Sequence, residues 1–214
     1  MWVCKFEFDG SNILYGKAAK LFEISLSGYN LSSFEKGKKL FVNTAGRFFG
    51  DSSKLYKFLN YLKKDKHVKH LEEKNGFFMI QVQEDYSFKY FYSPSFIYIS
   101  PVLIDKKGKY HFNISSWERK DVEKLLKLVE KFPAYKLLSL KQEKIGDVSI
   151  SKISPDLTDK QKNAMELAVK NGYYEFPKKI TLKELAKIIG VAYSTFQQHL
   201  SYAEKKINSS FCPK

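Results

Sequence analysis

The sequence predicts an α+β protein in two parts, an N-terminal α+β region followed by a C-terminal all-α domain. Up to about residue 145, short runs with apolar side chains at every second position alternate with stretches of helical spacing. Asn75-Gly76 stands between two of those runs, which is typical of a tight β-hairpin. After residue 156 only helical spacing remains. We therefore expect domains over residues 1–148 and 154–210, joined by a short polar segment.

The N-terminal region opens with a half-buried strand, because apolar and polar residues alternate from Trp2 to Phe8. A short amphipathic helix is expected over residues 13–22. Glycines and Asn30 interrupt the pattern that follows, so the stretch up to Lys38 is predicted to be irregular. A further strand is expected over residues 39–49.

The remaining elements of this region are a helix, two hairpins, a second helix and a last strand. They are expected at 51–62, 68–72 with 77–82, 96–104 with 110–114, 117–132 and 135–144. Ser116 is expected to cap the second helix. Strands, helices and hairpins in this order suit a split βαβ arrangement of ferredoxin-like or ACT-like type. The element order, without sequence identity between the halves, suggests two pseudo-repeats.

A run of aromatic residues stands out between residues 86 and 98. Its members are Tyr86, Phe88, Tyr90, Phe91, Tyr92, Phe96 and Tyr98. The favoured interpretation is plain core, and a ligand pocket or a dimer interface are the other structural options. Because lysines are interleaved with these rings, stacking of single-stranded RNA bases is a further alternative. The neighbouring Glu84-Asp85 pair is expected to be a solvated charge in a turn.

The segment from Leu182 to Leu200 has the spacing of a helix-turn-helix. Thr181 and Glu184 predict a capping box at the start of the first helix, and Gly190 supplies a left-handed residue at its end. The second helix is expected over residues 194–206. The side chains expected to face inward are Leu182, Leu185, Ala186 and Ile189 in the first helix and Phe196, Leu200, Ala203 and Ile207 in the second. The alternative is a helical hairpin that only packs.

The outer face of the second helix carries uncharged side chains that are rich in hydrogen-bond donors and acceptors. Glutamine can form a bidentate pair with adenine, and hydroxyl side chains can contact base edges or phosphates. Lysines near the start of the first helix can hold phosphates as point charges. The predicted DNA-binding residues are Tyr193, Ser194, Thr195, Gln197, Gln198, Ser201, Lys178, Lys179 and Lys183.

Several sequence blocks in this part of the chain occur in a fixed order. They are Leu157-Thr158-Asp159-Lys160-Gln161, Gly172-Tyr173-Tyr174-Glu175-Phe176-Pro177, Leu182-Lys183-Glu184-Leu185-Ala186, Ser194-Thr195 and His199-Leu200. The segment that they span resembles the C-terminal domain of archaeal bacterio-opsin-activator-type (Bat-like) regulators. The resemblance implies an archaeal DNA-binding transcriptional regulator and, by analogy, a fold akin to the fourth region of sigma factors. Two positions depart from the family pattern, because Lys178 replaces the usual arginine and Ala192 replaces the usual capping serine.

The amino-acid composition limits which kinds of binding partner and which cellular compartment are expected. A formal net charge of +14 and a pI near 9.5 favour an anionic partner, with nucleic acid first. Of the 37 basic residues only Arg47 and Arg119 are arginine, so a lysine-rich composition accounts for part of this charge. The sequence contains no signal peptide and no apolar run near the ~18 residues of a membrane helix. We therefore expect a soluble, cytoplasmic protein without membrane contact.

No residue pattern for catalysis, for a metal or for an organic cofactor rises above chance, so we expect no enzyme and no cofactor. The favoured function is sequence-specific binding of double-stranded DNA by the C-terminal domain in transcriptional regulation. The N-terminal region would then sense a small-molecule effector or form a homodimer, and a dimer predicts a pseudo-palindromic site. The alternatives are a small-molecule sensor that acts through protein partners, and an RNA-binding protein.

Overall fold

The computed structural model describes residues 1–146, residue 148 and residues 157–211 of the 214-residue chain. The chain divides into two units, Met1–Ser151 and Lys152–Lys214, and each unit is described by itself. The polar segment that we predicted between residues 148 and 154 lies outside the described residues. No helix within the described ranges is both long and apolar enough to cross a bilayer.

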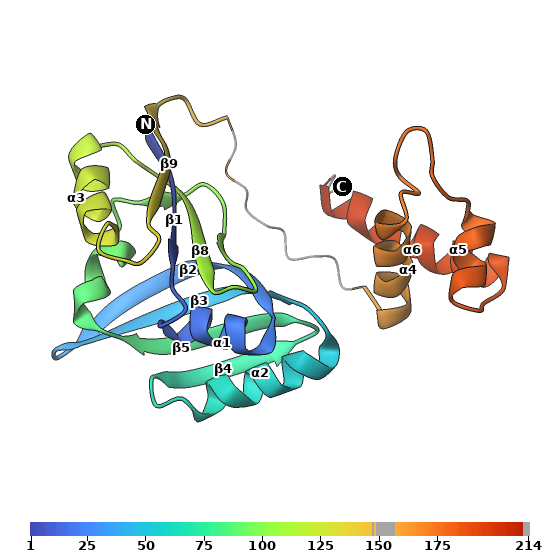
Figure 1. Ribbon diagram of the computed structural model, residues 1–214, viewed down its shortest axis with the longest axis horizontal. Helices are drawn as coiled ribbons and strands as arrows, with labels where there is room; N and C mark the ends of the chain where they lie inside the picture. The colour runs from blue at the N-terminus through green and yellow to red at the C-terminus, as the bar shows by residue number, and fades with distance from the viewer. Residues whose placement is uncertain (147, 149–156, 212–214) are drawn as a thin grey trace. The chain divides into compact units, whose positions relative to one another are not determined.

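Within the described residues of the N-terminal unit, nine strands form one antiparallel sheet (Figure 1). Their order is β4-β5-β3-β2-β7-β8-β1-β9, and β6 also pairs with β8. The strands are β1 (Trp2–Asp9), β2 (Ser25–Lys36), β3 (Lys39–Phe49), β4 (Val68–Lys74), β5 (Phe77–Glu84), β6 (Ile97–Tyr98), β7 (Val102–Ile104), β8 (Lys109–Ser116) and β9 (Lys136–Gln142). Helices pack on this sheet, so the predicted α+β class is confirmed.

The helices of this unit bury apolar stripes against the sheet. They are α1 (Leu14–Phe22), α2 (Ser52–Lys64), the 3₁₀-helix η1 (Tyr86–Tyr92) and α3 (Arg119–Val129). Helix α2 buries Phe58 and Leu62, four residues apart, and α3 buries Val122 and Leu125, three residues apart, so each helix turns one face to the core. Figure 1 shows α1 and α2 beside each other along the β4 side, and α3 beside β1. All of them join one hydrophobic cluster, so sheet and helices stabilise each other.

One topological unit occurs twice in the sheet. Strands β3 and β4 both pair antiparallel with β5, so they are parallel to each other, and α2 joins them. Strands β8 and β9 are related in the same way across β1, and α3 joins them. Each is a split βαβ unit of the kind expected from the sequence. The orders β4-β5-β3-β2 and β9-β1-β8-β7 therefore correspond strand by strand, and β2 and β7 meet where the halves join.

The prediction of an irregular stretch up to Lys38 is wrong, because β2 runs through most of it. Glycine usually interrupts regular structure, but Gly28 lies inside β2. A Cβ atom at this position would lie 2.7 Å from the Ala45 carbonyl oxygen, so the absence of a side chain lets β2 and β3 approach closely. Asn30 is held by hydrogen bonds with Tyr98 and Thr44. Cross-strand contacts therefore override the local signals in this segment.

Two other predicted elements are corrected in detail. The strand expected over residues 96–104 is divided into β6 and β7, and Pro101 precedes the second piece. Ser116 does not cap the predicted helix 117–132, because α3 begins at Arg119 with Glu118 as its N-cap. The Asn75-Gly76 hairpin is confirmed, with φ of 54° and 77° at the two turn residues.

The C-terminal unit consists of three helices within the described residues, α4 (Asp159–Lys170), α5 (Leu182–Ile188) and α6 (Tyr193–Phe211). Its core comprises Ala164, Ala168, Leu185, Ala186, Phe196 and Leu200. Most of the predicted inward side chains are thus confirmed. Ile189 is the exception at 45% exposure, because α5 ends at Ile188 and the next residue turns away as the C-cap.

Candidate DNA-binding surface

The start of α5 is fixed by the predicted capping box. The Thr181 hydroxyl accepts a hydrogen bond from the Glu184 backbone N–H at 3.3 Å, and the Glu184 carboxylate accepts one from the Thr181 N–H at 2.8 Å. The Thr181 hydroxyl also donates to this carboxylate at 2.7 Å, and this hydrogen bond, with the one from the Thr181 N–H, holds the pKa of Glu184 below its usual value. At the other end Gly190 has φ of 70°, and the Val191 N–H returns to the Ala186 carbonyl. Both predicted ends of the helix are therefore confirmed.

Replacement of the cap has an expected cost that can be measured directly. Thr181→Ala should lower the free energy of unfolding of the C-terminal unit by about 1 kcal/mol, because the Glu184 backbone N–H loses the hydroxyl that accepts its hydrogen bond. Urea unfolding followed by far-ultraviolet circular dichroism checks this value. Ser201→Ala, at an exposed hydroxyl in the middle of α6, should stay within about 0.5 kcal/mol of the wild type. Equal losses in the two variants would contradict a role for the capping box.

Helix α6 separates a buried stripe from an exposed one. Phe196, Leu200 and Ala203 are 0–2% exposed, and Phe196 and Leu200 pack in one core with residues of the other two helices. Its outer face is polar, and the side chains at i, i+3, i+4 and i+7 on it are Ser194, Gln197, Gln198 and Ser201, all exposed. Thr195 is also exposed. The donors and acceptors of two glutamine amides and two hydroxyls are therefore available on one helix face.

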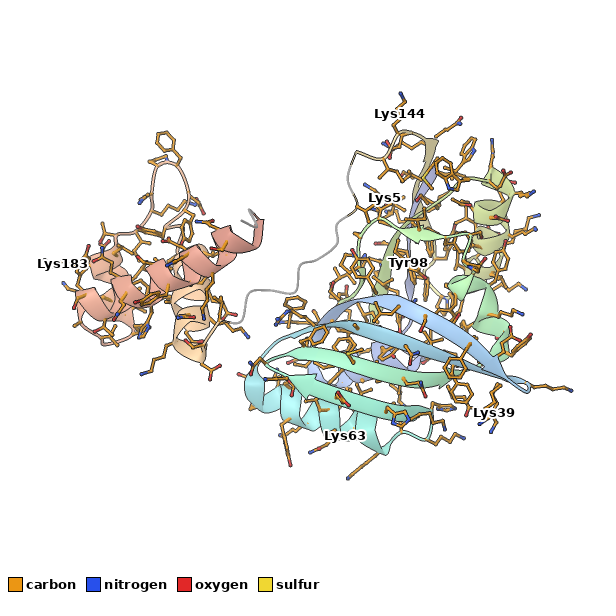
Figure 2. The ribbon with its side chains drawn as sticks, turned by 180° about the vertical axis from the view of Figure 1, so that it is seen from behind. Lys5, Lys39, Lys63, Tyr98, Lys144 and Lys183 are labelled. Atoms are coloured by element: carbon orange, nitrogen blue, oxygen red, sulfur yellow. The ribbon has the colours of Figure 1, made fainter. Side chains whose placement is uncertain are left out.

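A groove of about 370 Å³ adjoins the beginning of this helix. It brings together Tyr193 and the three lysines predicted to contact phosphates, Lys178, Lys179 and Lys183. Two of these lysines already have partners. The Lys178 ammonium lies 4.1 Å from the ring centroid of Tyr173, and the Lys179 ammonium lies 2.5 Å from a carboxylate oxygen of Glu175. Figure 2 shows Lys183 at the periphery of the C-terminal unit.

A second capping box positions α4 and also fixes the far half of α6, and it was not predicted. Thr158 and Gln161 cap α4, and the Gln161 side-chain oxygen accepts a further hydrogen bond from the Lys206 ammonium at 3.0 Å. The Tyr174 hydroxyl donates to the Glu204 carboxylate at 2.6 Å. Burial and this carboxylate raise the pKa of Tyr174. The spacing of Thr158 and Gln161 was the available signal, since it is that of a capping box.

The geometry of this unit agrees with comparisons to known proteins. Residues 157–209 match the family described as "HTH DNA binding domain". The bacterioopsin transcriptional activator of Halobacterium salinarum is 39% identical over 56 residues, which cover 26% of this chain and 8% of that protein. The dimethyl sulfoxide reductase transcriptional activator of Haloferax volcanii is 36% identical over 90 residues, which cover 40% of this chain and 41% of that protein.

A further similar protein is the dimethyl sulfoxide reductase transcriptional activator of Halobacterium salinarum, 43% identical over 54 residues that cover 25% of this chain and 24% of that protein. The chain thus spans less than half of the length of each of these relatives. The matched family segment coincides with helices α4 to α6 and the loops between them. Residues 157–209 are therefore a helix-turn-helix domain of the type found in bacterio-opsin-activator-type regulators.

Proposed function

We propose that this protein is a sequence-specific DNA-binding transcriptional regulator, with α6 as the helix that enters the major groove. The observation that carries the proposal is the exposed polar stripe of α6 beside a groove lined by three lysines. A helix-turn-helix presents its second helix to DNA in this manner. The relatives named as transcriptional activators support the same function.

Each predicted residue has a role that its chemistry and position suit. Gln197 and Gln198 would pair with base edges, because an amide can donate to and accept from adenine at once. Lys178, Lys179 and Lys183 would contact phosphates at the start of α6 and contribute affinity without base preference. The hydroxyl side chains Tyr193, Ser194, Thr195 and Ser201 would contact base edges or phosphates.

The N-terminal unit would serve this DNA-binding domain by sensing a small-molecule effector, by forming a homodimer, or by both. A pocket inside the unit supports effector sensing. Strands β4 and β9 form the two edges of the sheet within the described residues, and β9 exposes Leu137 and Leu138, which supports pairing between copies. A dimer would bind two half-sites about one helical turn apart.

A salt titration of DNA binding tests the proposed function. The logarithm of the association constant for duplex DNA should fall linearly with the logarithm of salt concentration, because lysines release counterions from phosphates. Replacing Lys178, Lys179 and Lys183 together with glutamine should reduce the steepness of this line by roughly 0.9 for each phosphate that a lysine no longer neutralises. Gel retardation between 50 and 200 mM salt provides the measurement, since phosphate contacts act over this range.

The matched control removes the same net charge from the other unit. Lys57, Lys63 and Lys64 are exposed on α2, and their replacement with glutamine should leave the salt dependence unchanged. Equal effects of the two triple variants would refute phosphate contacts by the groove. Wild-type protein that gives no retardation at low salt, yet is stabilised by a small molecule, would favour the sensor that acts through protein partners.

A further inference from the structure

A pocket of about 80 Å³ lies inside the N-terminal unit, and residues from both halves of the sheet line it. Its walls come from β1, β7 and β8 on one side and from β2, β3 and β5 on the other, with α1 and η1 contributing side chains. One ordered water needs roughly 10–15 Å³ on the same scale, so the pocket has room for a small organic molecule. A pocket between two repeated halves is a usual place for a ligand.

The walls are aromatic and held in place by packing and hydrogen bonds. Phe8 stacks on Tyr110 across the β1–β8 pair with ring centroids 5.2 Å apart. The Tyr98 hydroxyl donates to the Phe91 carbonyl oxygen at 2.9 Å and accepts from the Asn30 amide at 3.2 Å, which fixes η1 over β2. Figure 2 shows Tyr98 in the interior of the unit. Phe88, Phe91 and Tyr92 of the aromatic run line the pocket, and the other members pack in the core, except Tyr86, which is 44% exposed.

The charge in this pocket is opposite to that of the chain as a whole. Glu84 is the one charged side chain among the described residues that line the pocket, and no lysine or arginine is among them, although the chain has 37. Glu84 continues the alternation of Phe78, Ile80 and Val82, which are buried on the core face of β5. The expectation that Glu84 is a solvated turn charge is therefore wrong.

The surroundings of the Glu84 carboxylate leave it without a cationic partner in the pocket. Burial raises its pKa, a hydrogen bond from the Tyr92 hydroxyl and the charge of His67 oppose this rise, and the Asp85 charge adds to it. Tyr15 and Tyr110 line the same pocket, and burial, with the charge of Glu84, raises the pKa values of these phenols and of Tyr92. The phenols therefore stay neutral, and a bound cation would be the counter-ion that the carboxylate lacks.

We infer that this pocket binds a small organic cation, an ammonium group with apolar substituents, held by the carboxylate of Glu84 and by the surrounding tyrosine rings. Aromatic side chains attract quaternary ammonium groups through their ring faces, and a partly desolvated carboxylate adds charge complementarity. An anionic ligand would meet Glu84 without any basic side chain to balance it. The inference rests on the proposed function in that it names the chemical class of the small-molecule effector that the N-terminal unit would sense.

Calorimetry on the full chain with choline and its neutral isostere 3,3-dimethyl-1-butanol tests this inference. Choline keeps its charge at every pH, and the two molecules have nearly the same shape. We expect choline to bind at least about tenfold more tightly than the isostere, and to raise the melting temperature. Equal affinities for the two probes, or binding of neither by folded protein, would overturn the inference.

One variant and one matched control locate the site. Glu84→Gln should weaken choline binding at least about tenfold and abolish the preference over the isostere. Glu72→Gln removes an equal charge from an exposed position on β4 and should bind choline as the wild type does. Loss of binding in both variants would contradict a site at Glu84. Tryptophan fluorescence verifies that each variant is folded.

The pH dependence of choline binding gives a second readout that a purely structural role of Glu84 would not produce. Choline affinity should rise with pH as Glu84 ionises and then become constant. Tyr92→Phe removes a hydrogen bond that lowers the pKa of Glu84, so its profile should move to higher pH and reach the wild-type plateau. An unmoved profile would exclude Glu84 as the titrating group that holds the cation.

The same protein preparation separates this inference from the proposed function. Choline binding by a protein that does not retard DNA would support the pocket and refute the regulator. Retardation of DNA by a protein that binds neither probe would support the regulator and refute the cation site.

Discussion

Phe196→Ala should lower the free energy of unfolding of the C-terminal unit by about 3–5 kcal/mol, because it leaves a cavity where a fully buried ring was. Phe196 is 0% exposed in a core that otherwise consists of small residues and two leucines. A domain of this size has a stability of only a few kcal/mol, so the variant should be largely unfolded at 37 °C. Loss of DNA retardation should follow.

The two tryptophans allow this loss to be assigned to one unit. Trp2 and Trp117 both lie in the N-terminal unit, so tryptophan fluorescence reports the unfolding of that unit alone. In Phe196→Ala the urea transition seen by fluorescence should stay in place, while the helical signal at 222 nm falls. Tyr202→Ala, at a side chain 49% exposed on the same helix, is the control and should change stability by less than about 0.5 kcal/mol. A fluorescence transition that moves with the helical signal would contradict independent unfolding.

Gln197→Ala and Gln198→Ala together should relax base preference by roughly 1–3 kcal/mol for each bidentate pair that is removed. The physical reason is that one glutamine amide can donate to and accept from the edge of adenine at the same time. A different base at that position leaves part of the amide without a hydrogen-bond partner. Affinity for random duplex at low salt should change little, because phosphate contacts remain. Retention of low-salt affinity together with a weaker preference therefore distinguishes base contacts from general damage.

Selection of bound sequences from a random pool measures this effect for both proteins. The wild type should enrich one motif, and the double variant should enrich the same motif with weaker preference at the positions contacted by the glutamines. Asn208→Ala removes an exposed amide from the last turns of α6 and should retain the full motif. An unchanged motif in the double variant would remove both glutamines from the readout.

Local chemistry accounts for the elements that the sequence predicted well. The Thr181 and Glu184 side chains cap α5 with their own neighbouring backbone, and Asn75-Gly76 forms a turn within four residues. Neither depends on the rest of the fold. Strand β2 could not be predicted in the same way, because its pairing with β3 and β7 involves distant residues, which local breakers such as Gly28 do not reveal.

The candidate sites also differ in how far the sequence alone could predict them. The exposed stripe of α6 follows from helical periodicity, so Gln197 and Gln198 could be predicted from spacing alone. The groove that joins Tyr193 to Lys183 depends on how the loop before α5 folds back, and spacing does not contain this information. The prediction for Glu84 is wrong because a charged residue beside a turn is usually solvated. Its place in the alternation of β5 is the signal that indicates burial.

The position of β1 in the middle of its half of the sheet affects the order of events during synthesis. Trp2 pairs with Ser116 of β8 and with Gln142 of β9, so β1 is synthesised well before either of the strands that it pairs with. Until those partners are made, the side chains of Phe6 and Phe8, which the folded sheet buries, stay exposed on the nascent chain. The nascent chain therefore cannot complete the pocket around Glu84 until β8, which contributes Tyr110 and Phe112 to its wall, has been synthesised.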